Sequence, residues 1–339
     1  RHLWEPDEAR YAYVAREMRE TGEWAVMHRH GELYPDKPPV MFWLINVSSL
    51  LTGGTINSIS TRLPSLLGAI LSLWVTVSLL SRWRDEKTGW RAGLILATTY
   101  LFWKLGGMGQ IDSLLCGLEM MAFYFLVTDS PRTVWRPALA YAFMGVAVIT
   151  KGPVGLAVPL GAYAVAMAAS GRKAELKRFH WLWGLLITAA FPAAWLSWAW
   201  LSGGPPEYFQ NVVFGQTSKR VLEGTGHGGP FWYYLVHFPL EFMPWTLILP
   251  AALTALWRRK EDTVTRRFLL GWMLFVIVFF SIPTDKRQLY ILFAYPPAAM
   301  LVALAWDDIR RLSPAWTRST AGAVIGIMLV LGMAGIVLS

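Results

Sequence analysis

Residues 63–81 read LPSLLGAILSLWVTVSLLS, an uncharged apolar stretch of about the length that crosses a bilayer as one helix. The hydrocarbon core of a membrane is about 30 Å thick, and roughly 20 residues of α-helix span it. Similar apolar runs recur to the end of the chain, at residues 90–108, 111–128, 135–150, 152–169, 181–201, 231–257, 268–282, 289–306 and 319–338. The pattern predicts an all-α, polytopic transmembrane bundle of about ten helices.

The composition agrees with a membrane protein. Of the 339 residues, 55% are hydrophobic and 16% are charged, whereas about a quarter of a soluble domain is charged. No polar stretch is long enough for a second core, so residues 1–339 are predicted to form a single domain. The net charge of +9 comes from short Lys and Arg clusters between apolar runs, which favours a topology signal over nucleic-acid binding. The single Cys116 excludes a disulfide framework.

The basic residues also predict the orientation. Alternate connections between the apolar runs hold 18 Lys and Arg on one side and 6 on the other, and the richer side is expected to be cytoplasmic. Residues 1–62 then form an external loop, and a helix is expected to precede Arg1. Residues 38–51 are apolar but short for a crossing, so they predict a surface-lying or re-entrant helix. The ionisable residues of this loop are therefore expected on the outer, non-cytoplasmic face.

The external loop at residues 1–62 contains two pairs of oppositely charged residues that are candidates for a functional site. Residues 3–11, LWEPDEARY, predict a helix start, because proline suits the first turn and acidic side chains complement the helix dipole. Asp7 and Arg10 are three residues apart and can meet on one helix face. Further along, residues 34–43, YPDKPPVMFW, contain two prolines that enforce an extended chain and present Asp36 and Lys37 before the apolar run. The Asp7–Arg10 pair can also be explained as part of a solvated helix face. Asp36 and Lys37 can be explained as a polar helix cap.

Other ionisable residues occur at the outer junctions and inside spans. Asp112 begins the third span and either caps it or faces a site, and Lys151 interrupts a tight external hairpin, where it either snorkels or faces a pocket. Glu119 and Glu241 fall within spans, where an ionisable group is costly and is a functional candidate unless a neighbouring helix satisfies it.

The later external segments add cations. The loop at residues 202–230 contains Lys219, Arg220 and the glycine-rich GTGHGG at residues 224–229, which lacks the spacing of a nucleotide-binding loop. Lys286 and Tyr290 lie in the last interior external turn. Carboxylates and cations on one side of the membrane suit a reaction in which a hydroxyl loses a proton and a phosphate leaves.

These segments together resemble the GT-C glycosyltransferases of the protein mannosyltransferase and lipid A aminoarabinose transferase type. The resemblance covers nearly the whole chain in order, through residues 4–11, 34–43, RLPS at 62–65, Asp112, TKG at 150–152 and YILFAYPP at 290–297. It implies an inverting transfer of a sugar from a polyprenyl-monophosphate carrier to a hydroxyl of a lipid, glycan or protein. The active site would face the periplasm or outside of a bacterial-type inner membrane.

The resemblance also implies residue roles. Asp7 would be the catalytic carboxylate, with Asp112 as a second carboxylate. The predicted phosphate-binding residues are Lys37, Lys151, Lys219 and Arg220. The other predicted cavity residues are Glu8, Arg10, Tyr34, Asp36, His227, Lys286 and Tyr290.

Some expectations stay open at this point. Position 36 is Asp where these transferases commonly have Glu, which moves the carboxylate inward by one methylene and leaves a metal-binding or phosphate-bridging role open. A carboxylate-rich site can hold Mg²⁺ or Mn²⁺, although no spacing here demands such an ion. The alternatives are a lipid-linked sugar transporter or flippase, an oligosaccharide ligase with a diphosphate-linked donor, and a structural membrane subunit. A transporter is typically built from internal repeats with broken helices, which are not evident here.

Overall fold

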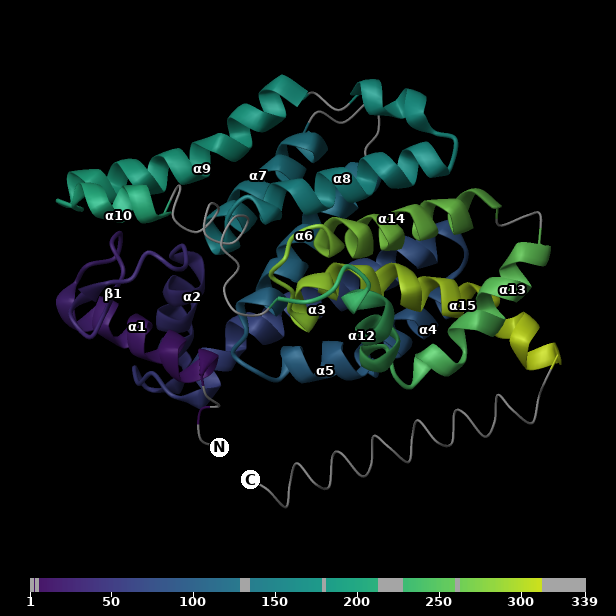
Figure 1. Cartoon of the computed structure of the whole chain (residues 1–339), viewed down its shortest axis with the longest axis horizontal. Coiled ribbons are helices and arrows are strands. Elements are labelled where there is room, and N and C mark those ends of the chain that lie inside the picture. Colours follow the sequence, from purple (N-terminus) through teal and green to yellow (C-terminus); the bar gives the residue numbers. More distant parts are fainter. Residues whose placement is uncertain are drawn as a thin grey trace, which may run out of the picture.

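The chain folds almost entirely into helices. The computed structural model describes residue 3 and residues 6–128, 135–178, 181–212, 228–259 and 263–312, and the only sheet within them is a two-stranded hairpin. Figure 1 shows long helices side by side, with a smaller N-terminal group against one end of them, on the left. The prediction of an all-α fold is confirmed.

The N-terminal group consists of two short helices and the hairpin between them. α1 (Asp7–Thr21) buries the face formed by Tyr11, Val14, Ala15 and Met18, as their spacing of three and four residues predicts. Gly22 ends the helix in the left-handed conformation, with φ of 76°. The hairpin strands are β1 (His28–Arg29) and β2 (Glu32–Leu33).

α2 (Val40–Ser49) follows the two prolines and continues into a 3-10 turn, η1 (Leu50–Thr52). Together they are about 20 Å long at 1.5–2 Å per residue, well short of the bilayer core. The Asn46 side-chain amide donates to the Ala15 carbonyl at 2.9 Å and ties α2 to α1. The short helix predicted for residues 38–51 is therefore present, packed against α1.

The main bundle is built from longer helices. They are α3 (Ser58–Trp83), α6 (Ile111–Val127), α7 (Trp135–Lys151), α8 (Val154–Ala169), α9 (Trp181–Leu201), α14 (Thr263–Ser281) and α15 (Tyr295–Leu312). α3 and α6 approach very closely at Gly68 and Gly117, where an added Cβ would lie 2.2 Å and 2.5 Å from the facing backbone. Small residues allow such close helix contacts in membrane proteins. Shorter connections are η2 (Lys173–Arg178), α10 (Pro206–Gln210) and η6 (Gln288–Ala294).

The run at residues 90–108, predicted to be one span, is broken. α4 (Glu86–Ala97) ends before Thr98 and Thr99, and α5 (Tyr100–Gly106) begins after them. The Thr98 and Thr99 hydroxyls donate to the carbonyls of Leu94 and Ile95, and Thr99 is extended. Such local side-chain bonds compete with the continuing helix. α5 then meets α6 at 107°.

The run at residues 231–257 is also divided, into α12 (Tyr233–Glu241), η5 (Trp245–Leu247) and α13 (Leu249–Arg258). The two parts are bent by 110°. Pro239, Pro244 and Pro250 lie along this segment, and each lacks the N–H that a continuous helix needs.

These breaks affect the number of candidate spans. By length and composition, four described segments can cross a membrane, namely α3, α9, α14 and residues 288–311, and up to six can do so if each bent pair is one span. α7 and α8 are shorter apolar helices of 17 and 16 residues. The tenth predicted span, residues 319–338, lies outside the described residues.

The two ends of the bundle carry different polar residues. At one end, Arg91 pairs with Asp307 at 2.9 Å and Arg259 pairs with Asp308 at 2.8 Å. Asp307 and Asp308 are near the last residue of α15, a helix about 27 Å long. Arg287 lies at the other end, just before η6, which leads into the first residue of α15. In Figure 1 the α13–α15 end is on the right and α1 and α2 are on the left. Arg91 and Arg259, two of the basic residues assigned to the cytoplasmic side, therefore lie away from the N-terminal group.

Candidate active site

Asp7, the predicted catalytic carboxylate, is the first residue of α1. Only 8% of its side chain is exposed. Arg10, one turn along the same helix, lies 3.1 Å from one carboxylate oxygen, and Arg287 lies 3.2 Å from the other. Because Arg287 comes from the turn before η6, Asp7 joins segments 280 residues apart. The Asp7 carboxylate is thus buried between two partly exposed arginines, so the Asp7–Arg10 pair is not simply a solvated helix face.

Asp112 and Lys151 form a second buried pair. Asp112 lies in the first turn of α6, which has no side-chain cap, so it does not serve as the cap that its position allowed. Lys151 is the last residue of α7, and Gly152 follows with φ of 92°, which lets the chain turn at once into α8. The ammonium group binds the Asp112 carboxylate and lies 4.6 Å from the centre of the Tyr290 ring.

Asp7 and Asp112 influence the same neighbours. Burial raises the pKa of Tyr11 well above its usual value, and the negative charges of Asp7 and Asp112 raise it further. Burial opposes the charged form of Arg287, but Asp7 and Asp112 outweigh it and raise the pKa of Arg287. The two carboxylates therefore lie on the same side of the bundle, within electrostatic reach of one guanidinium group.

A cavity of about 460 Å³ opens beside the Asp112–Lys151 pair, and neither Asp7 nor Arg287 is among the residues that line it. Its polar lining includes Asp36, Asp112, Lys151 and Tyr290, all predicted as site residues. Much of the remaining wall is apolar and comes from α6, α7, α8, α9, α14 and η6, including Leu115, Ile149, Val154, Trp195, Phe280 and Phe293. An apolar wall next to a polar end suits a ligand with a hydrocarbon chain and a charged head group.

Several other predicted site residues are not among those that line the cavity. Tyr34 is buried near Asp36, and burial together with the Asp36 charge raises the pKa of Tyr34 to about 12, so the phenol is neutral at physiological pH. Arg10 binds Asp7, and neither Arg10 nor Lys37 is among the cavity-lining residues. Lys219, Arg220 and His227 lie outside the described residues.

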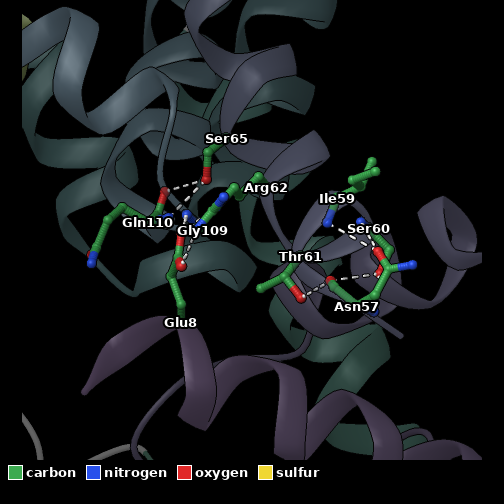
Figure 2. Close-up of polar contacts among 9 residues, drawn as sticks. All are labelled: Glu8, Asn57, Ile59, Ser60, Thr61, Arg62, Ser65, Gly109 and Gln110. Atoms are coloured by element: carbon green, nitrogen blue, oxygen red, sulfur yellow. Dashed lines mark hydrogen bonds and ion pairs between the residues drawn. The ribbon is translucent and has the colours of Figure 1, made fainter. Parts of the chain in front are cut away.

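Glu8 differs from its predicted place in the cavity, because it is completely buried between helices. Figure 2 shows its carboxylate directed from α1 toward Arg62 of α3 and the backbone of Gly109. Arg62 donates through Nε and Nη2 at 2.9 Å each, and the Gly109 N–H donates as well. A paired, bidentate geometry of this kind satisfies a buried carboxylate. Glu8 therefore positions α1, and with it Asp7, on the bundle.

Replacing Glu8 by glutamine is expected to lower the free energy of unfolding by about 3–5 kcal/mol, because it leaves Arg62 without its buried counter-charge. Thermal unfolding of the purified protein in detergent measures the effect. Glu175→Gln is the matched control, since Glu175 pairs with Arg172 in an exposed position and such pairs contribute about 0–1 kcal/mol. Equal melting temperatures for the two variants would contradict the anchoring role of Glu8.

Lys286 also differs from the prediction. Its ammonium donates to the carbonyls of Ser281 and Pro283, so it stabilises the C-terminal end of α14 and does not line the cavity. The adjacent Asp285 does line it and accepts a hydrogen bond from the Tyr290 hydroxyl at 3.2 Å. Sequence analysis assigned no role to Asp285 or Arg287, because consecutive charged residues in a turn do not reveal which side chain faces inward.

The described residues do not gather a metal site. No three His, Cys, Asp or Glu side chains in that part of the chain are grouped as metal ligands. The expectation of a Mg²⁺ or Mn²⁺ ion stays a prediction.

Comparisons with known proteins show which family the chain is similar to. Residues 36–198 match the family described as dolichyl-phosphate-mannose-protein mannosyltransferase. The undecaprenyl phosphate-alpha-4-amino-4-deoxy-L-arabinose arabinosyl transferase of Pectobacterium carotovorum is 32% identical over 93% of this chain and 56% of its own length. That of Aeromonas salmonicida is 31% identical over 91% of this chain and 57% of its own length. The chain thus spans somewhat more than half the length of these relatives.

Solved structures show the same relationship. ArnT from Cupriavidus metallidurans, in a crystal structure with bound undecaprenyl phosphate, superposes with a TM-score of 0.81 at 26% identity, over 99% of this chain and 61% of that one. The oligosaccharyltransferase of Archaeoglobus fulgidus shares the fold, with a TM-score of 0.58 at 12% identity, over 98% of this chain and 51% of that one.

The chain is therefore an integral membrane protein with the GT-C fold. Within that class its sequence is similar to the lipid A aminoarabinose transferases, the type that its ordered motifs resemble.

Proposed function

We propose that this chain is the membrane domain of an inverting glycosyltransferase. It moves a sugar from a polyprenyl-monophosphate carrier to a hydroxyl acceptor on the periplasmic or extracellular face of a bacterial-type inner membrane. The observation that carries the proposal is that Asp112 and Lys151 line one cavity with an apolar wall, while Arg287 binds Asp7 on the same side of the bundle. The related transferases are named for an undecaprenyl-phosphate-linked aminoarabinose donor, which is the same class of molecule.

In this proposal Asp7 acts as the general base. A carboxylate oxygen takes the proton of the acceptor hydroxyl while the hydroxyl oxygen attacks the anomeric carbon of the sugar. Arg10 and Arg287 hold the carboxylate from two sides and so restrict its orientation. Attack from the face opposite the phosphate inverts the configuration at the anomeric carbon.

The cations would stabilise the leaving group. As the bond between the anomeric carbon and the phosphate oxygen breaks, the electron pair and negative charge go to the polyprenyl phosphate. Lys151 lies at the polar end of the cavity, and its partial release from Asp112 would provide an ammonium group for this charge. Charge stabilisation of this kind is worth several kcal/mol when the donors are held in place before the reaction. Lys37, Lys219 and Arg220 are proposed to hold the phosphate as well.

The test uses the full-length protein in liposomes with a radiolabelled polyprenyl-phosphate sugar and candidate acceptors. The proposal predicts that label moves to a hydroxyl acceptor while free polyprenyl phosphate accumulates. Label that stays on the carrier but changes leaflet would instead identify a transporter. Consumption only of a diphosphate-linked donor would identify an oligosaccharide ligase.

Arg287→Gln is expected to reduce kcat/KM for transfer by about 10- to 100-fold, because a hydrogen bond to a charged group is worth roughly 1.5–3 kcal/mol. Arg259→Gln is the control, since Arg259 pairs with Asp308 at the opposite end of the bundle. Steady-state transfer rates at matched protein concentration measure both. Equal losses in the two variants would show that Arg287 has no specific role at Asp7.

A further inference from the structure

A second hollow, apart from the cavity described above, lies between α1 and the turn that leads into α3. Its volume is about 490 Å³, and it is lined by Arg16, Arg19 and Glu20 of α1 and by residues 54–56. None of these residues takes part in the proposed transfer reaction. The hollow is therefore separate from the candidate active site.

The two arginines of this hollow bind neutral oxygens. Arg19 donates through Nη1 to the Ser49 hydroxyl at 2.9 Å and through Nη2 to the Gly54 carbonyl. Arg16 donates through Nη2 to the Ile56 carbonyl at 3.4 Å. A guanidinium group carries five N–H donors, so each arginine keeps donors that these contacts do not use.

The positive charge of the hollow is only partly balanced. Glu20 also lines it, but neither Arg16 nor Arg19 forms an ion pair with Glu20 or with another carboxylate in the described part of the chain. Because the two arginines are three residues apart on α1, their side chains are neighbours on one helix face. Guanidinium groups bind phosphate oxygens through paired hydrogen bonds. The hollow therefore favours an anion that contains phosphate.

Exposed apolar side chains flank the hollow on both sides along the chain. Leu50 and Leu51 of η1 precede it, and Leu51 is 81% exposed. Ile59 follows it in the first turn of α3, and Leu66 and Ile70 are exposed about two and three turns further along the same face. This face is about 16 Å long at 1.5 Å per residue, close to half of the ~30 Å bilayer core. The acyl chains of one leaflet thus fit along α3 next to the hollow.

We propose that this hollow binds the headgroup of an anionic phospholipid from the leaflet beside α1. Arg16 and Arg19 would bind the phosphodiester, and the acyl chains would lie along the face of α3 that carries Ile59 and Ile70. A zwitterionic headgroup would bring a further cation against the two guanidinium groups, so an anionic headgroup is favoured. Asp7 is the first residue of α1, so the bound phospholipid would hold the helix of the proposed base against the membrane. The site goes beyond the proposed transfer and does not depend on it.

The experiment is photo-crosslinking of the full-length protein in detergent, without any sugar donor. The probes are phosphatidylglycerol and phosphatidylcholine with the same photoreactive group near the glycerol, and mass spectrometry identifies the labelled peptides. Wild-type protein is expected to be labelled at residues 47–59 about 10- to 30-fold more by phosphatidylglycerol, because each arginine near an anionic headgroup contributes roughly a factor of five. Excess inorganic phosphate should displace little of this label, because it lacks the acyl chains.

Arg16→Gln is the main variant, since Arg16 makes one long contact in the fold. Its labelling by phosphatidylglycerol should fall about fivefold, the contribution of one arginine, at an unchanged melting temperature. Arg16→Lys keeps the charge and should retain most of the labelling. Arg29→Gln is the matched control, because Arg29 is an exposed arginine of the same N-terminal group that does not line the hollow. Its labelling should equal that of the wild type.

Several results would overturn the proposal. They are equal labelling of the wild type by the two phospholipids, full labelling of Arg16→Gln, and an equal loss in Arg29→Gln, which would indicate attraction by overall charge. Displacement of the lipid by inorganic phosphate would identify a site for a free anion. The wild-type comparison needs no variant, so it decides even if Arg16→Gln does not fold. Because the assay contains no sugar donor, a failure of the proposed transfer would leave its outcome unchanged.

Discussion

Full-length protein with Asp7→Asn is expected to transfer sugar about 100- to 10,000-fold more slowly than wild type, because an amide cannot accept the proton of the acceptor hydroxyl. Asparagine retains the size of the side chain and one carbonyl oxygen for Arg10 or Arg287. Binding of sugar-free polyprenyl phosphate should therefore change little. Initial rates with saturating donor and acceptor, measured beside the donor Kd, separate the loss of chemistry from a loss of binding.

Asp307→Asn is the control for this prediction. Asp307 is also a carboxylate paired with an arginine, Arg91, but it lies at the opposite end of the bundle and is 53% exposed. Its variant should retain nearly the full rate. Wild-type turnover by purified Asp7→Asn protein would show that another group removes the proton.

Lys151→Met is expected to have the second large effect, on both stability and donor binding. The Asp112 and Lys151 side chains are only 6% and 8% exposed, so removing the ammonium leaves a buried carboxylate without its counter-charge. Breaking such a pair costs about 3–5 kcal/mol of unfolding free energy. The binding of polyprenyl phosphate should weaken as well, because a cation at the polar end of the cavity is lost.

The double variant Asp112→Asn with Lys151→Met separates these two effects. Neutralising both partners removes the unpaired charge, so most of the lost stability should return, whereas donor binding should stay weak. Thermal unfolding and lipid binding on the single and double variants provide the measurements. A double variant with wild-type donor affinity would exclude Lys151 from phosphate recognition.

The sequence predicts the helical fold well because uncharged runs have few alternatives to helix within a membrane. It does not predict where those runs break. Thr98 and Thr99 interrupt one run through hydroxyl bonds to the preceding turn, and these residues are equally compatible with an unbroken helix. The prolines at positions 239, 244 and 250 were visible in the sequence, but the 110° bend depends on how the neighbouring helices pack.

The sequence predicts several residues of the site but not the contacts that they make. Sorting charges by membrane side placed Asp7, Asp112 and Lys151 together, and the structure brings them to one side of the bundle. Sequence spacing does not identify partners across the fold. Glu8 binds Arg62 of α3, 54 positions away. Lys286 binds carbonyls at the end of the preceding helix, α14. Its neighbour Asp285 lines the cavity, and its other neighbour, Arg287, binds Asp7.

The most direct test of the convergence of these charges is an experimental structure of the full-length protein in a lipid nanodisc with a bound polyprenyl-phosphate sugar. We predict that the phosphate lies within hydrogen-bond distance of Lys151, with the anomeric carbon between it and Asp7 and the isoprenoid along the apolar wall at Trp195 and Phe293. A phosphate bound beside Arg91 and Arg259, at the opposite end of the bundle, would contradict the account.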